Sequence, residues 1–108
     1  MPKAAQIAEL NDAFRRTLSG GRVLITSGIE SEGEEFVAAV LAAVRSFNNF
    51  HPDNDPHGEH DFGALSVEGI QVFFKLDYYD PSEQFGSEDP ADPEKTRRVL
   101  TIMLPEEY

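Results

Sequence analysis

The sequence has no cysteine, and this absence excludes whole classes of functional site. Without thiols, the 108 residues cannot form disulfides, supply a thiolate nucleophile, or build a zinc finger or an iron–sulfur cluster. Any metal ion would have to use His and carboxylate ligands. Apart from that possibility, we expect no cofactor.

Long apolar runs are also missing. No stretch approaches the roughly 20 apolar residues that a membrane-spanning helix needs. Residues 1–18 mix charged side chains into their apolar pattern, whereas a secretory signal has a continuous apolar region. We therefore expect a cytoplasmic protein without membrane contact, and the absence of disulfides favours the same compartment.

Basic residues are scarce, with 9 Lys and Arg against 20 Asp and Glu and a net charge of −11. Residues 49–94 hold twelve acids and one base, Lys75, while the remainder of the chain is neutral. Nucleic-acid binding needs clustered bases, and only Arg15–Arg16 and Arg97–Arg98 are adjacent. Direct contact with nucleic acid is therefore disfavoured. The two Arg pairs are expected at the surface, balancing the acidic segment.

The first predicted helix covers residues 2–18, where apolar residues recur every three or four positions. Its buried stripe is formed by Ile7, Leu10, Phe14 and Leu18. Asp12, Arg15 and Arg16 fall outside this stripe, so they are expected to face solvent.

A strand and a second helix follow. Residues 22–26 are consecutively apolar and partly β-branched, which predicts a strand buried on both faces. Ser31 and Glu34 match a capping box, so the second helix is expected to begin there. Its apolar face continues until about Asn48.

The second half of the sequence predicts a hairpin and a final strand. Residues 61–67 and 70–79 flank the short turn Glu68-Gly69, as in a β-hairpin. Residues 98–104 are apolar on both faces, which indicates a central strand. We expect one domain over residues 1–108 with an α+β fold. Two helices would pack on one face of a mainly antiparallel sheet of about four strands.

Several segments resemble a known family. These are NDAFRR (11–16), NDPHGEHDFG (54–63), KLDYYD (75–80) and GSEDPADP (86–93), the last followed by RVLTIMLPEEY near the chain's end. Together they are similar to a family of short bacterial proteins classed as a domain of unknown function, often encoded on plasmids and other mobile elements. The resemblance implies a bacterial, cytoplasmic protein with a role in mobile-element biology. It carries no catalytic residue.

Residues 51–61 contain all three histidines and four carboxylates. The candidate catalytic or metal-binding residues are His57, Glu59, His60 and Asp61. They suit a small hydrolase, either metal-dependent or using acid/base chemistry. In the acid/base version His60 is the base, oriented by Glu59 or Asp61 and assisted by Tyr78 or Tyr79. The competing interpretation is that these side chains only hold a polar loop in shape.

The acidity suggests a different function. An acidic surface can imitate a phosphate backbone and occupy the basic groove of a nucleic-acid enzyme. The sequence therefore predicts a protein-interaction module that inhibits or regulates a basic, nucleic-acid-handling partner, of the anti-restriction or anti-CRISPR type. The partner-binding candidates are Asp53, Asp55, Asp80, Glu83, Glu88, Asp89 and Asp92. Ordinary solubility is the competing explanation of this charge.

A third interpretation concerns assembly. Phe73 and Tyr79 lie on the strand face opposite the predicted core. If no helix covers that face, it could pair with a second subunit and form a homodimer.

Overall fold

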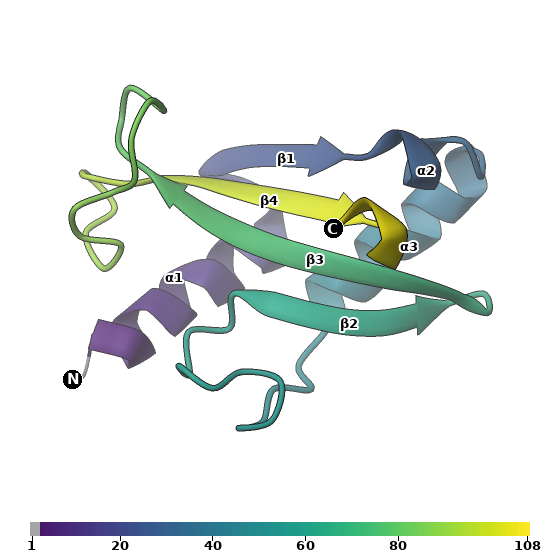
Figure 1. The fold of residues 1–108 in the computed structure, drawn as a ribbon, viewed down its shortest axis with the longest axis horizontal. Helices are drawn as coiled ribbons and strands as arrows, with labels where there is room; N and C mark the ends of the chain where they lie inside the picture. Colours follow the sequence, from purple (N-terminus) through teal and green to yellow (C-terminus); the bar gives the residue numbers. More distant parts are fainter. Residues whose placement is uncertain (1–2) are drawn as a thin grey trace.

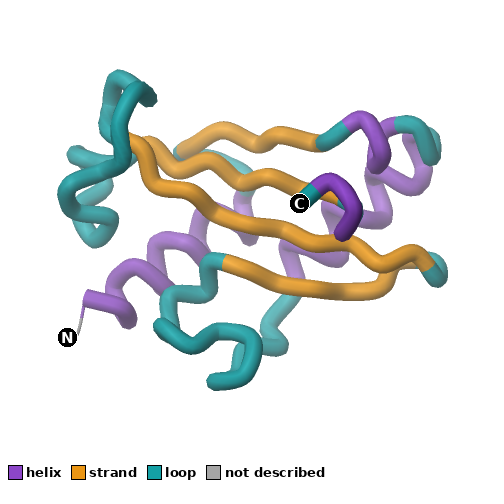
Figure 2. The backbone as a smooth tube through the Cα atoms, in the orientation of Figure 1, coloured by secondary structure: helices purple, strands orange, loops and turns teal. Residues whose placement is uncertain are grey.

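The computed structural model describes residues 3–108, which form a four-stranded sheet with helices on one side (Figure 1). The elements are α1 (Lys3–Thr17), β1 (Gly21–Ile25), α2 (Ser27–Glu30), α3 (Glu34–Ser46), β2 (Phe62–Val67), β3 (Ile70–Tyr79), β4 (Arg97–Met103) and the 3₁₀ helix η1 (Pro105–Glu107). Figure 2 shows α1 and α3 behind the strands and η1 on the other side. The predicted α+β class is confirmed, with α2 as an additional short helix.

The strand order is β1-β4-β3-β2. β1 runs parallel to β4, whereas β4–β3 and β3–β2 are antiparallel. β4 therefore has a neighbour on each side, as its two-sided apolar pattern predicts. The prediction that residues 22–26 are buried on both faces is wrong, because β1 is an edge strand and Leu24 remains 42% exposed.

The hairpin is confirmed in register and in turn chemistry. β2 pairs with β3 from Phe62 opposite Lys75 to Val67 opposite Ile70. Both turn residues have positive φ, 52° at Glu68 and 82° at Gly69. Such a two-residue turn matches the twist of the strands that it joins.

The core lies between the sheet and the helices. α1 contributes Phe14, and α3 contributes the apolar stripe Phe36, Val40 and Val44. The sheet side of the core is formed by Val72, Phe74, Leu76, Leu100 and Ile102. Apolar burial of this kind supplies most of the stability of a small domain.

The predicted capping box does not form. The Ser31 hydroxyl donates to the carbonyl of Gly28 and so belongs to the end of α2. α3 instead begins at Glu34 after Gly33, whose φ of 103° few other residues adopt. Gly33 thus separates two helices where the sequence predicts one start.

Between Lys3 and Tyr108, no helix has both the length and the apolar character needed to cross a membrane.

Candidate functional site

Polar residues of α1 point into the protein, contrary to the solvent-facing position predicted for Arg15. Its side chain is only 1% exposed. Nη1 donates to the carbonyls of Val44 at 2.9 Å and Phe47 at 2.6 Å, at the C-terminal end of α3. The Val44 carbonyl also accepts the backbone N–H of Phe47 at 3.3 Å. The buried guanidinium adds hydrogen bonds at this end of the helix, where carbonyls lack the usual helical partners. Nη2 donates to Asp12 at 2.8 Å.

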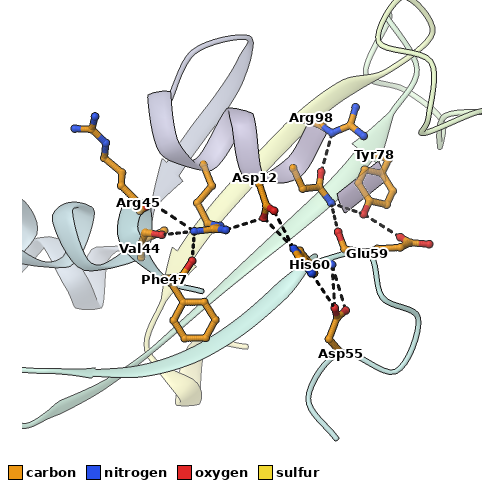
Figure 3. Close-up of polar contacts among 11 residues, drawn as sticks. Asp12, Val44, Arg45, Phe47, Asp55, Glu59, His60, Tyr78 and Arg98 are labelled. Carbon is orange, nitrogen blue, oxygen red and sulfur yellow. Dashed lines mark hydrogen bonds and ion pairs between the residues drawn. The ribbon is translucent and has the colours of Figure 1, made fainter. Parts of the chain in front are cut away.

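Asp12 in turn holds His60 (Figure 3). Nδ1 of the imidazole lies 3.0 Å from both carboxylate oxygens of Asp12. Nε2 points towards Asp55, with 3.8 Å to the nearer oxygen. The ring stacks on Phe50 at 4.1 Å between centroids, and the side chain is 30% exposed. His60 therefore has a carboxylate near each ring nitrogen, and the ring of Phe50 covers one face of the imidazole.

Asp55 has an internal role in the 47–61 loop. It is 7% exposed and accepts the backbone N–H of His60 at 3.2 Å and 3.3 Å. His60 has φ of 57°, in the left-handed region that non-glycine residues rarely occupy. The Asp55 carboxylate thus stabilises an unusual backbone conformation, and it is not available to a partner at the surface.

Asn11 organises the other half of the network. It is fully buried, and Nδ2 donates to the Glu59 carbonyl and to the Tyr78 hydroxyl, each at 2.9 Å. Its Oδ1 accepts from Nε of Arg98 at 2.7 Å. Arg98 also donates to the carbonyl of Pro90. The 47–61 loop and the 80–96 loop therefore meet at α1.

Arg98 is also buried, with 5% of the residue exposed. The prediction that both arginine pairs lie at the surface is therefore wrong for Arg98 as well as for Arg15. In each adjacent pair one arginine is buried and its neighbour, Arg16 or Arg97, is exposed. The buried members carry the hydrogen bonds described above, so only the exposed ones could balance the surface acids.

Glu59 and Tyr78 also come together, because the Tyr78 hydroxyl donates to the Glu59 carboxylate at 3.0 Å. Burial raises the pKa of the Tyr78 phenol above its ordinary value, and the charge of Glu59 raises it further. Tyr79 is exposed and lies on the opposite face of β3. Of the two tyrosines considered for acid/base chemistry, only Tyr78 is near the His60 loop.

The four candidate catalytic residues do not converge as predicted from the sequence. His60 is oriented by Asp12 rather than by Glu59 or Asp61, and His57 is exposed. Burial raises the pKa of Asp61, and the charges of Glu59 and Asp55 raise it further. In the part of the chain that the structure describes, no three His, Asp or Glu side chains are placed to hold a metal ion.

A shallow groove of about 320 Å³ opens beside His60. Its lining includes Phe50, His51, Pro52, Asp55 and Gly58. A carboxylate-held imidazole next to a groove is the arrangement of a general base. Here, however, both ring nitrogens face carboxylates, so neither is directed towards a substrate in the groove.

The aspartates of the 80–96 loop shape its backbone. Asp80, Asp89 and Asp92 accept the backbone N–H groups of Gln84, Ala91 and Glu94, respectively. These bonds to a residue two to four positions ahead are typical of turns. The Ser82 hydroxyl also donates to Asp80 and lowers the pKa of that carboxyl. The loop therefore holds its own charges in fixed positions.

Three loop acids also have basic neighbours. Glu83 pairs with Arg22 at 2.8 Å. Glu88 lies 3.5 Å from Lys95, and Asp89 lies 3.5 Å from Lys3. Such solvent-exposed pairs contribute only about 0–1 kcal/mol each, so a partner could replace them at little cost. Asp53 is exposed on the 47–61 loop.

Negative charge is not confined to the two loops. Glu30, Glu32, Glu34 and Glu35 are exposed around α2 and the start of α3. In Figure 1 this end of the molecule lies opposite the 80–96 loop. The acidic surface therefore has two poles rather than the single region that the sequence suggests.

The network residues that the sequence did not reveal are Asn11, Asp12, Arg15 and Arg98. Asn11 and Asp12 lie 48 to 87 residues from the loop and strand groups that they bind. Arg15 lies about 30 residues from the carbonyls at the end of α3. One signal was available for Asn11. It falls four residues after Ile7 and three before Phe14, which places it on the buried stripe of α1.

The sequence model of a family described as "Protein of unknown function (DUF3768)" matches residues 25–107. This range contains both loops but not Asn11 or Asp12 of α1. No curated protein and no solved structure matches the chain. Because the match covers most of the sequence, the chain belongs to this family of proteins of unknown function.

Proposed function

We propose that this protein is an acidic interaction module that binds a basic, nucleic-acid-handling partner and occupies the surface that nucleic acid would use. The observation that carries the proposal is the unequal burial of charge. Of nine bases, Arg15 and Arg98 are buried, whereas of twenty acids only Asp55 is. The folded surface is therefore at least as acidic as the sequence, and it attracts basic partners over long range.

The order of the 80–96 loop supports the proposal. Asp80, Asp89 and Asp92 each fix a turn through a backbone hydrogen bond. A charge array that is already ordered loses less conformational entropy on binding than a flexible one. This loop, with Glu83 and Glu88, is the proposed contact surface. An inhibitor of this kind also suits the mobile-element role that the sequence resemblance implies.

A hydrolase built on the His60 loop has less support. A base needs an unoccupied nitrogen within reach of the proton that it removes. Nδ1 of His60 bonds Asp12, and Nε2 faces Asp55. This arrangement favours a structural role for the imidazole.

The proposal is tested with a variant that removes charge and keeps the loop. In Asp80→Asn/Asp89→Asn/Asp92→Asn, each side-chain oxygen can still accept its backbone hydrogen bond, because Asn serves the same turns as Asp. The tagged variant and the tagged wild-type chain are used to capture partners from the native bacterial cell. We expect the variant to retain less of a basic nucleic-acid-handling protein.

The matched control removes three charges at the other acidic pole. Glu30→Gln/Glu32→Gln/Glu35→Gln is expected to capture the partner as well as the wild type does. If both variants captured equally less of the partner than the wild type does, net charge alone would drive capture. Unchanged capture by the loop variant would contradict the proposed contact surface.

A further inference from the structure

The side of the sheet that faces away from α1 and α3 gathers exposed apolar groups. Of the four large apolar side chains that are exposed within residues 3–108, three line one groove of about 580 Å³ on this side. They are Leu24 on β1, Tyr79 on β3 and Tyr108 after η1. Exposed apolar side chains that gather in one groove rimmed by polar residues are typical of an interaction site. We call this side the open sheet face.

Tyr108 enlarges the apolar part of the open sheet face. Its ring meets Phe62 and Phe73 edge-on, with centroids 6.0 Å and 6.1 Å apart. The ring centroids of Phe62 and Phe73 lie 5.1 Å apart. Tyr108 as a whole residue is 76% exposed. The three rings therefore form an aromatic cluster whose outer member is available to a partner.

The outward side chains of β3 have a self-complementary order. Strand alternation places Phe73, Lys75, Asp77 and Tyr79 on the open sheet face. Lys75 and Asp77 are half-exposed and lie 3.0 Å apart. An aromatic residue stands at each end of this row, and the two residues between them carry opposite charges. A two-fold symmetric interface requires this property, because each contact occurs twice with the roles exchanged.

We propose that the open sheet face is the interface of a homodimer in which two sheets pack face to face with their β3 strands antiparallel. Lys75 of each copy then faces Asp77 of the other. Tyr79 of each copy faces the aromatic cluster of the other. Aligned packing of two twisted sheets at a separation of about 10 Å is a common arrangement.

The charge of the open sheet face suits the approach of a second copy better than the acidic poles do. Two chains with a net charge of −11 repel one another. Strand register, however, places the exposed bases Arg22 and Arg97 on the same side as Lys75. Arg22 pairs with Glu83 and Lys75 with Asp77, and Glu107 also lines the groove. The open sheet face is thus close to charge balance, so two copies approach here at a lower electrostatic cost than at the acidic poles. In such a dimer the 80–96 loops point to opposite ends.

The test is a charge swap measured by sedimentation equilibrium of the full chain over a dilution series. The wild type is expected to reach twice its monomer mass of 12.0 kDa. Asp77→Lys and Lys75→Asp each place like charges opposite one another twice per dimer, so the dissociation constant should rise by more than about tenfold. The double variant Lys75→Asp/Asp77→Lys restores the pairing and should dimerise like the wild type.

Glu32→Lys, at the acidic pole near α3, is the control for a change in net charge and should leave the dissociation constant within about twofold of the wild type. Circular dichroism confirms that each variant is folded. A monomeric wild type overturns the proposal. A dimer that is insensitive to both single reversals, or a double variant that stays monomeric, overturns it as well. The outcome is independent of the proposed acidic-partner function.

Discussion

His60 and Asp12 are 48 residues apart in the sequence, yet Nδ1 of the imidazole lies 3.0 Å from both carboxylate oxygens of Asp12. Arg15 binds the same carboxylate and the carbonyls that end α3. One chain of polar contacts therefore runs from α3 through α1 to the 47–61 loop. Buried polar networks of this type position loops through their hydrogen bonds. Within residues 3–108, Nε of Arg15 is the one buried side-chain polar atom without a hydrogen-bond partner.

Replacing His60 should destabilise the fold. His60→Asn keeps a residue that tolerates positive φ, but it loses the contact of the ring with Asp12. Removing a hydrogen bond to a charged group typically costs about 1–3 kcal/mol. We expect a decrease of this size in the free energy of unfolding, measured by urea denaturation.

His57→Asn is the matched control, because His57 lies on the same loop and is exposed. Its effect should stay within about 0.5 kcal/mol. Equal effects of the two substitutions would mean that the contact between His60 and Asp12 does not hold the loop.

Tyr78 should make the fold sensitive to alkaline pH. Its phenol has a raised pKa in the folded protein and returns to the ordinary value of 10.0 on unfolding. Above pH 10 the unfolded state therefore binds fewer protons than the folded state, so this contribution to stability falls as pH rises. Below pH 10 the contribution is fully present. Tyr78→Phe should reduce the decline in the free energy of unfolding above pH 10. Tyr79→Phe, on the open sheet face, should leave that decline unchanged.

Asp61 should weaken the fold at neutral pH. Its pKa is raised from the ordinary 3.8 in the folded state, because burial and the neighbouring acids disfavour the charge. Stability from this group is present below pH 3.8 and is lost as the pH rises through the folded pKa. Asp61→Asn should therefore be more stable than the wild type at neutral pH, by less than about 1 kcal/mol after solvent screening. The gain should vanish in acid. Asp53→Asn, an exposed change on the same loop, should show no such gain.

Gly63 is required by the packing of the hairpin against the core. A Cβ at this position would overlap the ring of Phe74 and press on Phe47. Gly63→Ala should lower the free energy of unfolding by about 1–3 kcal/mol, the usual cost of overpacking. Gly86→Ala is the control, since a Cβ there meets only an ordinary contact with the Tyr78 carbonyl. Equal stability of the two variants would contradict the packing described.

Local patterns in the sequence predicted much of the fold. The stripe of Ile7 and Phe14 identified α1, and the Glu68-Gly69 turn identified the hairpin. The two-sided apolar pattern identified β4 as central. These features depend on neighbours a few residues apart, so periodicity and turn chemistry reveal them.

The remaining features depend on contacts between distant residues. An edge strand and a central strand can both have a short apolar sequence, so the place of β1 in the strand order could not be inferred. Arg15 looked solvent-facing on a helical projection, because its partners lie at the end of α3. Asp12 carried no local sign that it would meet His60. Tertiary packing decides such pairs, and a single sequence does not record them.

The most direct test of the proposed function is competition with nucleic acid. The tagged chain is immobilised with the protein that it captures from the native cell, and duplex DNA is then added. If the acidic surface occupies a nucleic-acid groove, DNA should release the captured protein in proportion to its concentration. Asp80→Asn/Asp89→Asn/Asp92→Asn should make release easier. A captured protein that binds DNA while it stays on the chain, with unchanged affinity in the loop variant, would contradict the account.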